Sequence, residues 1–319
     1  MNHSDPGRTE PERLASGRPD AVCAVLVTHH PDVAALRAAL AAVRPQVRAL
    51  VVVDNASPGI AAALVDTGAV LLRQSTNLGL ARAQNLGIDW ARRHACSHVL
   101  ILDQDSVPDP GMVDGLLAAW RRLSASTRVG ALGPRFRDLR EQRDAPFVRV
   151  AFPMSHKLWC GAFAAEIECD FLISSGALIP LAVLDDVGGM DDGLFIDNVD
   201  LEWSFRARSR GYALYGVCAA TMAHRLGDER RPVLGGLRQV VTHGPIRLYF
   251  IMRNRVALYA RPHTPRVWIA QDLPRVIAKF LIFSLLVGPR GDNVRFMVRG
   301  LLDGVRGRSG PCPLVGAPR

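Results

Sequence analysis

Apolar runs and amphipathic segments alternate along the first third of the chain. Four short runs rich in valine, leucine and isoleucine predict strands, and the first of them suits a strand buried on both faces. They occupy residues 21–27, 50–53, 70–73 and 98–102. Between them, apolar side chains recur at helical spacing in residues 32–43, 60–66 and 79–93. This alternation predicts βαβ units, and therefore an α/β fold with a mostly parallel central sheet.

The rest of the chain differs from this α/β pattern. Residues 1–20 mix proline, glycine, arginine and glutamate without the apolar core of a signal peptide, which predicts a disordered tail. From residue 128 to residue 224 the pattern favours short strands and long loops. Helical spacing returns at residues 245–260 and 272–286. We therefore expect a tail, an α/β domain and a basic helical region, with bounds 1–20, 21–230 and 231–319.

Polar residues cluster where the predicted strands end. The clusters are Thr28-His29-His30, Asp54-Asn55 and Asp103-Gln104-Asp105-Ser106. In open parallel sheets, ligands bind outside the carboxyl ends of the strands. The sequence therefore predicts a binding site at this edge of the sheet.

Basic residues are concentrated in the C-terminal region. The formal net charge of the chain is +9, yet residues 231–319 alone carry fifteen arginine and lysine residues against three aspartates. Such a segment favours a phosphate-bearing partner, namely nucleic acid, an anionic membrane surface or a lipid pyrophosphate. Aromatic residues make up only 6% of the chain and no nucleic-acid recognition motif occurs, so a membrane phosphate suits the segment better.

The apolar stretch at residues 276–287 is interrupted by Lys279 and is too short to span a bilayer. It fits equally a helix in the membrane interface and a helix packed on the main domain.

Six cysteines are scattered along the chain without any CxxC spacing. They are Cys23, Cys96, Cys160, Cys169, Cys218 and Cys312. This distribution argues against a zinc site and against a disulfide framework, so we expect buried thiols, as in a protein of a reducing cytoplasm.

Two carboxylates follow the fourth predicted strand. Asp103 and Asp105 are one residue apart, so both can turn toward one hard cation such as Mg²⁺ or Mn²⁺, and such a metal bridges diphosphate oxygens. It would neutralise charge that builds on a departing nucleoside diphosphate. The same tripeptide also occurs in solvated loops and helix caps, so its meaning depends on the residues around it.

A second acidic segment, residues 194–207, contains Asp197, Asp200 and Glu202 beside Trp203. A carboxylate here could act as a general base toward an acceptor hydroxyl, and the indole could stack on a sugar face. The alternative is a helix start with Asp200 as its cap. His224 could complete a metal site, or it could be an ordinary surface or core histidine.

Together these segments resemble the inverting glycosyltransferases of family 2, which have the Rossmann-like GT-A fold of nucleotide-diphospho-sugar transferases, and among them the rhamnosyltransferase branch. The resemblance extends from residue 21 to about residue 311. The matching motifs are Val27-Thr28-His29-His30-Pro31, Val53-Asp54-Asn55-Ala56-Ser57, the run from Asn77 to Gly87, Leu102-Asp103-Gln104-Asp105-Ser106, Ser174-Ser175-Gly176, the run from Phe195 to Trp203, and Arg253-Asn254. One departure is His29, where family members often carry tyrosine, so the stacking around the donor is open.

The resemblance implies a role for each matching residue. Asp200 would be the general base. The metal ligands would be Asp103, Asp105 and His224. The groups around the nucleotide and its diphosphate would be Thr28, Asp54, Asn85 and Arg253, together with the two metal-binding aspartates. The acceptor side would be formed by Ser175, Gly176, Glu202 and Trp203.

The resemblance also implies a reaction. Rhamnose would pass from dTDP-L-rhamnose to a cell-surface polysaccharide or a polyprenyl-pyrophosphate-linked acceptor by a single displacement that inverts the anomeric configuration. In this reading the enzyme serves polysaccharide and cell-wall biosynthesis as a cytoplasmic protein, peripheral on the inner face of the membrane. An alternative is the same fold with another donor, a UDP-hexose, for galactosyl or galactofuranosyl transfer.

Three other classes are less compatible with the sequence. A phosphatase of the haloacid-dehalogenase type would use Asp103 and Asp105, with Asp191 and Asp192 as distal metal ligands, but three predicted strands precede this aspartate pair. A non-catalytic carbohydrate-binding module would not need both the metal motif and Asp200. A nicotinamide-dependent enzyme would need a G-x-G-x-x-G motif after a strand, and none occurs.

Overall fold

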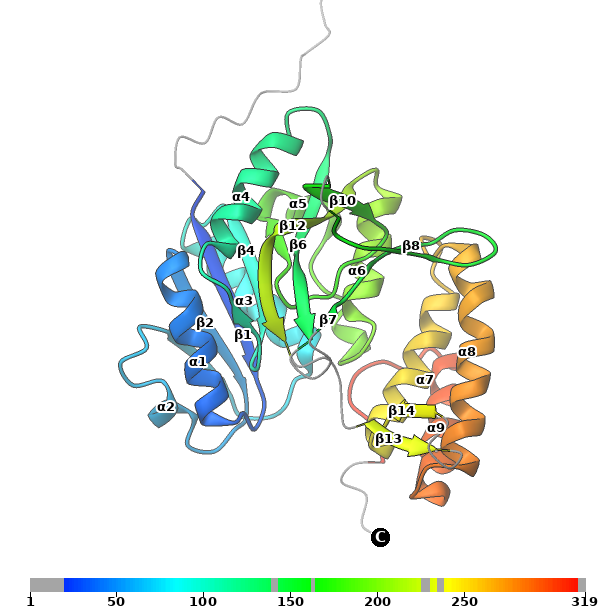
Figure 1. Ribbon diagram of the computed structural model, residues 1–319. Helices are drawn as coiled ribbons and strands as arrows, with labels where there is room; N and C mark the ends of the chain where they lie inside the picture. Colours follow the sequence, from blue (N-terminus) through cyan, green and yellow to red (C-terminus); the bar gives the residue numbers. More distant parts are fainter. Residues whose placement is uncertain (1–19, 139–142, 162–163, 225–229, 234–237, 315–319) are drawn as a thin grey trace, which may run out of the picture.

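The structure is a computed structural model that describes residues 20–138, 143–161, 164–224, 230–233 and 238–314 (Figure 1). The predicted tail, residues 1–20, therefore lies outside the described residues except for Asp20.

A large mixed sheet forms the centre of the molecule, in the strand order β10-β12-β6-β11-β4-β1-β2-β3. Its parallel half consists of β1 (Val22–Thr28), β2 (Ala49–Asn55), β3 (Val70–Gln74) and β4 (His98–Asp103). These four strands confirm the apolar runs of the sequence. Strands β1, β2 and β4 are buried on both faces and take valine and leucine on both sides, whereas the edge strand β3 is partly exposed.

The other half of the sheet is built from less regular sequence. Its strands are β5 (Val107–Pro108), β6 (Val129–Asp138), β7 (Arg143–Asp144), β10 (Glu166–Cys169), β11 (Leu178–Pro180) and β12 (Ala213–His224). Strand β11 runs antiparallel to β4, whereas β12 runs parallel to β6. Two small ribbons lie apart from this sheet: β8 (Phe147–Arg149) with β9 (His156–Leu158), and β13 (Arg230–Val233) with β14 (Arg238–Val241).

Helices cover both faces of the sheet (Figure 1). One face packs against α1 (Val33–Val43), α2 (Ile60–Ala63) and α4 (Met112–Leu123), and the other packs against α3 (Leu80–Arg93), α5 (Leu181–Val187) and α6 (Val199–Ser209). Alternate residues of β1 enter the two cores, because successive strand side chains point to opposite faces. Short 3₁₀ turns occupy Arg44–Gln46 and Asp192–Leu194.

Three further helices follow the sheet: α7 (Pro245–Tyr259), α8 (Arg266–Leu285) and α9 (Arg290–Val305). Helix α9 packs closely on α7, because a Cβ added at Gly300 would lie 2.4 Å from the carbonyl oxygen of Tyr249. Helix α8 begins earlier than its predicted start at residue 272, since Trp268 packs its ring against Phe205 of α6. Among the described residues, no helix is both long enough and apolar enough to cross a bilayer.

One expectation about the cysteines is wrong. Cys160 and Cys218 form a disulfide, whereas Cys23, Cys96, Cys169 and Cys312 are free thiols. The pairing of β10 with β12 continues at Cys218, whose N–H donates to the carbonyl of Ala165, and this brings two cysteines together that are 58 residues apart. Sequence spacing alone does not reveal a contact that depends on strand register, and the inference of a reducing compartment loses its support from cysteine usage.

Candidate functional site

A cavity of about 500 Å³ opens at the carboxyl ends of β1, β2 and β4. Its wall is completed by the segment before α6 and by one residue of α7. The lining residues are Val27, His29, Asn55, Asn77, Gly79, Leu80, Asp103, Gln104, Asp105, Ser174, Phe195, Ile196, Asp197, Asn198, Val199, Asp200 and Arg247. The predicted carboxylates Asp103, Asp105 and Asp200 therefore share one cavity, although Asp200 is more than ninety residues from the other two along the chain.

The turn that carries the aspartate pair is held by Ser175. Its hydroxyl accepts a hydrogen bond from the main-chain N–H of Asp103 (2.9 Å) and lies 2.7 Å from the hydroxyl of Ser106. Gly176 donates its N–H to the carbonyl of Ile101 and has φ of +79°. Both residues support the turn from behind, while the preceding Ser174 faces the cavity.

Asp200 lies in the first turn of α6, and Asn198 precedes the helix as its N-cap. The alternative in which Asp200 is the cap is therefore wrong. Burial raises the pKa of Asp200 to about 6, and the carboxylates of Asp103 and Asp197 add to this rise. Main-chain N–H groups of Leu201 and Ser174 oppose it. A carboxyl group whose pKa approaches neutrality is suited to accept a proton from a hydroxyl.

Thr28 and Asp54 lie behind the cavity wall. Both are fully buried, and the Thr28 hydroxyl donates to Asp54 Oδ1 (2.7 Å) while the N–H of Ser57 donates to Oδ2 (2.7 Å). Their neighbours His29 and Asn55 line the cavity instead. Successive residues at a strand end point in opposite directions, which is why the motif places one residue in the core and the next in the site.

Two side chains connect the strand ends above this network. The imidazole Nδ1 of His29 donates to the carbonyl of Asn55 (2.8 Å). The main-chain N–H of His29 donates to Gln104 Oε1 (2.9 Å). The amide of Asn55 accepts from the N–H of Leu78 and donates to the carbonyl of Gly79. The ends of β1, β2 and β4 are thus linked to the start of α3.

The segment before α6, residues 193–198, has a strained backbone and is called the site loop below. Phe195 has φ of 65° and ψ of −65° in a γ-turn closed by the N–H of Ile196 and the carbonyl of Leu194 (2.7 Å). Asp197 and Asn198 also have positive φ values, 64° and 62°. Each such conformation costs about 1–3 kcal/mol for a residue with a Cβ. Strain of this size persists only where the surroundings hold it.

The site loop also contacts the start of α3. The carbonyl of Phe195 accepts the N–H groups of Leu80 (2.6 Å) and Ala81 (3.3 Å), and a Cβ at Gly79 would lie 2.6 Å from the Phe195 ring. The predicted residue Asn85 contributes from one turn further along α3, where its amide binds Met190 and Asp192 outside the cavity lining.

The cavity wall contains an ion pair that the sequence did not predict. Arg247 of α7 lies 3.0 Å from Asp197 through Nη2 and Oδ1, and its Nε contacts both carboxylate oxygens. Arg247 lies in a segment without a recognised motif, so its contact with Asp197 is visible only in the folded chain.

Three other predicted residues lie outside the lining of this cavity. Glu202 is buried between Arg206 (2.8 Å) and His263 (3.0 Å), and Trp203 donates its indole N–H to the carbonyl of Gly188. Arg253 is buried against main-chain carbonyls. Their roles at the acceptor and the diphosphate stay predictions, and the contacts seen here support the fold.

His224 ends β12, where it pairs in register with Asp138 of β6. Its side chain lies outside the described part of the chain. Within the described side chains, no group of three or more His, Cys, Asp or Glu residues is arranged to hold a metal. Two aspartates on one cavity wall nevertheless fit Mg²⁺ or Mn²⁺, because such ions are often held by one or two carboxylates plus substrate phosphate oxygens.

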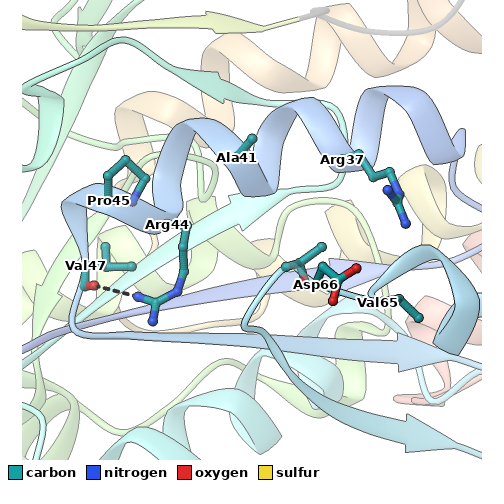
Figure 2. Close-up of a pocket in the computed structure, with 8 residues that line it drawn as sticks. Arg37, Ala41, Arg44, Pro45, Val47, Val65 and Asp66 are labelled. Atoms are coloured by element: carbon teal, nitrogen blue, oxygen red, sulfur yellow. Dashed lines mark hydrogen bonds between the residues drawn. The ribbon is translucent and has the colours of Figure 1, made fainter.

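A second hollow, of about 650 Å³, lies on α1 and the segment after α2 (Figure 2). Arg37 and Arg44 project along it, and their guanidinium groups donate to the carbonyls of Ala63 and Val47. Figure 2 also shows Asp66 across the hollow. This second hollow shares no residue with the cavity that contains Asp103, Asp105 and Asp200.

Comparison with known proteins identifies the domain. Residues 23–178 match the model of glycosyl transferase family 2. The chain carries a glycosyl transferase family 2 domain. It is also 27% identical over 295 residues to the dTDP-rhamnosyl transferase RfbF of Shigella flexneri, which covers 91% of this chain and 97% of the relative. The prediction of a glycosyltransferase is confirmed.

Solved structures of similar fold confirm the GT-A fold of this chain. GalNAc-T7 with UDP, GalNAc and Mn²⁺ matches with a TM-score of 0.57 and 15% identity, over 90% of this chain and 56% of that chain. Residues 1–349 of TarS from S. aureus with UDP-GlcNAc match with a TM-score of 0.56 and 15% identity, over 90% of this chain and 81% of that chain.

The phosphatase alternative is therefore wrong. Its distal ligands, Asp191 and Asp192, bind Arg261 and Arg82 instead of facing the aspartate pair, and neither residue lines the cavity.

Proposed function

We propose that this enzyme transfers a sugar from a nucleotide-diphospho-sugar to an acceptor hydroxyl with inversion, and that Asp200 is the general base. The observation that carries the proposal is the shared cavity of Asp103, Asp105 and Asp200, in which the pKa of Asp200 is raised to about 6. Near neutral pH this carboxylate is ionised and still basic enough to take a proton from a hydroxyl.

Asp103 and Asp105 would hold a divalent cation in this scheme. The cation would offset the negative charge that develops on the departing diphosphate. His224 is proposed as an additional ligand from the end of β12. Among the other lining residues, His29 and Asn55 would border the nucleotide, and Arg247 supplies a cationic group beside Asp197.

Asp200 removes the acceptor proton as the hydroxyl attacks the anomeric carbon, while the diphosphate leaves from the opposite face. A single displacement of this kind inverts the configuration. Retention would require a carboxylate nucleophile and a covalent intermediate.

The proposed donor is dTDP-L-rhamnose. The support is the relative named dTDP-rhamnosyl transferase, which aligns with this chain over nearly its whole length. A UDP-hexose is the second candidate, because the solved structures of similar fold contain UDP or UDP-GlcNAc. At 15% identity, however, that likeness concerns the fold.

The proposed acceptor is a cell-surface glycan or its lipid-linked precursor at an anionic membrane surface. Helix α8 exposes Leu273 (44%), Ile277 (60%), Leu281 (51%) and Leu285 (62%), which recur every four residues on one face. Figure 1 shows α8 at the edge of the molecule opposite α1. The exposed charged residues between 266 and 308 are Arg266, Arg275, Arg290, Arg295, Arg306, Arg308 and Asp292. An apolar helix face with an excess of arginine suits the interface of an anionic bilayer.

The donor is tested with purified protein and a panel of nucleotide sugars in the presence of Mn²⁺. We expect binding of dTDP-L-rhamnose, release of dTDP and a product of inverted configuration, and we expect Asp200→Asn to lower turnover about 10²–10⁴-fold with donor binding retained. Selection of a UDP-hexose would refute the donor. Loss of donor affinity with full turnover at saturation would refute the role of Asp200.

The membrane surface is tested by sedimentation with vesicles. Vesicles containing phosphatidylglycerol should bind the protein, and Ile277→Ser/Leu281→Ser should weaken that binding without changing donor affinity. Equal binding of both proteins would exclude the α8 face. A concentration-dependent dimer that the double variant abolishes would assign the face to a second copy of the chain.

A further inference from the structure

Two adjacent polar residues of α7, Arg253 and Asn254, are buried and take no part in the mechanism above. Their exposed fractions are 1% and 0%. Buried polar groups of this size need hydrogen-bond partners, and the partners reveal what the residues do. Nearly all of them are carbonyl groups of the site loop, which lies about sixty residues earlier in the chain.

Asn254 is directed at the site loop. Its amide nitrogen lies 2.9 Å from the carbonyl oxygen of Leu194, 2.7 Å from that of Ile196 and 2.8 Å from that of Asp197. Its amide oxygen accepts from Nε of Arg253 (2.9 Å), and this bond fixes which end of the amide faces the loop.

Arg253 continues the same set of contacts. One terminal nitrogen donates to the carbonyls of Gly193 (3.0 Å) and Leu194 (2.8 Å), and the other donates to the carbonyl of Gly310. The guanidinium also lies over the ring of Phe250, 4.9 Å from its centroid. Because its donors are used in this way and it does not line the cavity, its position does not suit contact with a diphosphate there.

The site loop needs this support because its backbone is strained. Three of its residues have positive φ, and the carbonyls of Ile196 and Asp197 lie between the 3₁₀ turn that ends at Leu194 and α6, which begins at Val199. Phe195 in turn receives the first N–H groups of α3, Asp197 pairs with Arg247, and α6 with Asp200 begins directly after the loop. The shape of this loop thus determines where the proposed base lies.

We propose that Arg253 and Asn254 are positioning residues, which hold the strained site loop through its carbonyl groups and thereby place Asp200 and Asp197 against the cavity. The inference rests on the proposed function for the role of Asp200. It also makes α7 part of the catalytic unit, although the helix lies beyond the matched family domain, which ends at residue 178.

The test compares Asn254→Asp with Asn293→Asp. Asn293 is an equally buried asparagine, and its amide nitrogen donates to the carbonyls of Phe283 and Val287 at the turn between α8 and α9. Both variants point a carboxylate at carbonyl oxygens and both should lose thermal stability. Only Asn254→Asp should release the site loop. Arg253→Lys is a milder variant that keeps the charge and loses the forked geometry.

Two readouts are measured at a temperature at which all variants are folded. Hydrogen exchange at the amides of Leu80 and Ile196 should speed up in Asn254→Asp and Arg253→Lys, and stay unchanged in Asn293→Asp. Release of dTDP from dTDP-L-rhamnose with Mn²⁺ should fall about 10²-fold in Asn254→Asp, since a displacement of about 1 Å has effects of this size. Donor affinity should change less than turnover.

Equal loss of turnover in Asn254→Asp and Asn293→Asp, in proportion to stability, would overturn the proposal, as would faster exchange with full turnover. If Arg253→Lys binds the donor more weakly and keeps its turnover, Arg253 would instead contact the diphosphate, as the sequence predicted. If Asp200→Asn retains turnover, the assigned base is wrong, and the exchange experiment still decides whether the pair holds the loop.

Discussion

Replacing Asp200 by asparagine should stabilise the protein at pH 8 while it removes most of the turnover. Burial, with the nearby charges of Asp103 and Asp197, raises the pKa of Asp200 from its usual 3.8 to about 6. Between these values the folded chain keeps a proton that the unfolded chain has lost, so the free energy of unfolding falls as the pH rises from about 4 to about 6. Above pH 6 the full penalty is present, and a difference of about two pKa units amounts to about 3 kcal/mol.

Asparagine has the same shape and no charge, so the variant avoids this penalty. At pH 8 the melting temperature should rise by roughly 5 °C for a chain of this size, and near pH 4.5 the gain should largely disappear. The measurement is thermal unfolding at both pH values in metal-free buffer. Glu202→Gln is the matched control on the same helix. Its charge is paired with Arg206, so that variant should lose stability.

Turnover gives the complementary result. In the wild type, activity should decline as the pH falls below about 6, because the base becomes protonated. An Asp200→Asn protein that is no more stable than the wild type at pH 8 would show that the site does not oppose this charge. The argument for a poised base would then fail.

Three further outcomes are expected. Asp105→Asn should remove the Mn²⁺ dependence of donor binding, measured by titration calorimetry with and without the metal. Gly79→Ala should lower the free energy of unfolding by roughly 1–3 kcal/mol and reduce turnover, because φ is +87° and the added Cβ would meet Phe195. Cys160→Ser should lower the free energy of unfolding by about 2–4 kcal/mol in oxidising buffer, and a reductant should abolish the difference from the wild type.

The parallel half of the fold follows directly from the sequence. Strands such as Val22–Thr28 are buried on both faces, so their apolar pattern is nearly continuous and hard to mistake. Helix α2 is shorter than its predicted range, since it ends at Ala63 and the next residues form turns. The disulfide between Cys160 and Cys218 was not predictable, because it depends on the register of β10 against β12.

The candidate site was predictable in its carboxylates and less so in its surroundings. Asp103, Asp105 and Asp200 meet in one cavity, as their motifs indicated. The Asp197–Arg247 pair was missed, because an arginine on a helix gives no signal until the helix is placed. A match in sequence does not give the direction of each side chain. It therefore does not show which residue of a motif faces the ligand.

The residues of the motifs therefore divide by what they contact. Some, such as Asp103 and Asp200, face the cavity and carry charge. Others, such as Asp54 and Asn254, are fully buried and bind main-chain or hydroxyl groups of neighbouring segments. A strained loop does not keep its shape when water competes for its carbonyl groups. The buried residues that bind those carbonyls are therefore as necessary as the charged residues that face the cavity. A family signature in this fold thus specifies a backbone shape together with a chemistry, and a buried motif residue is better assigned from its hydrogen bonds than from its charge.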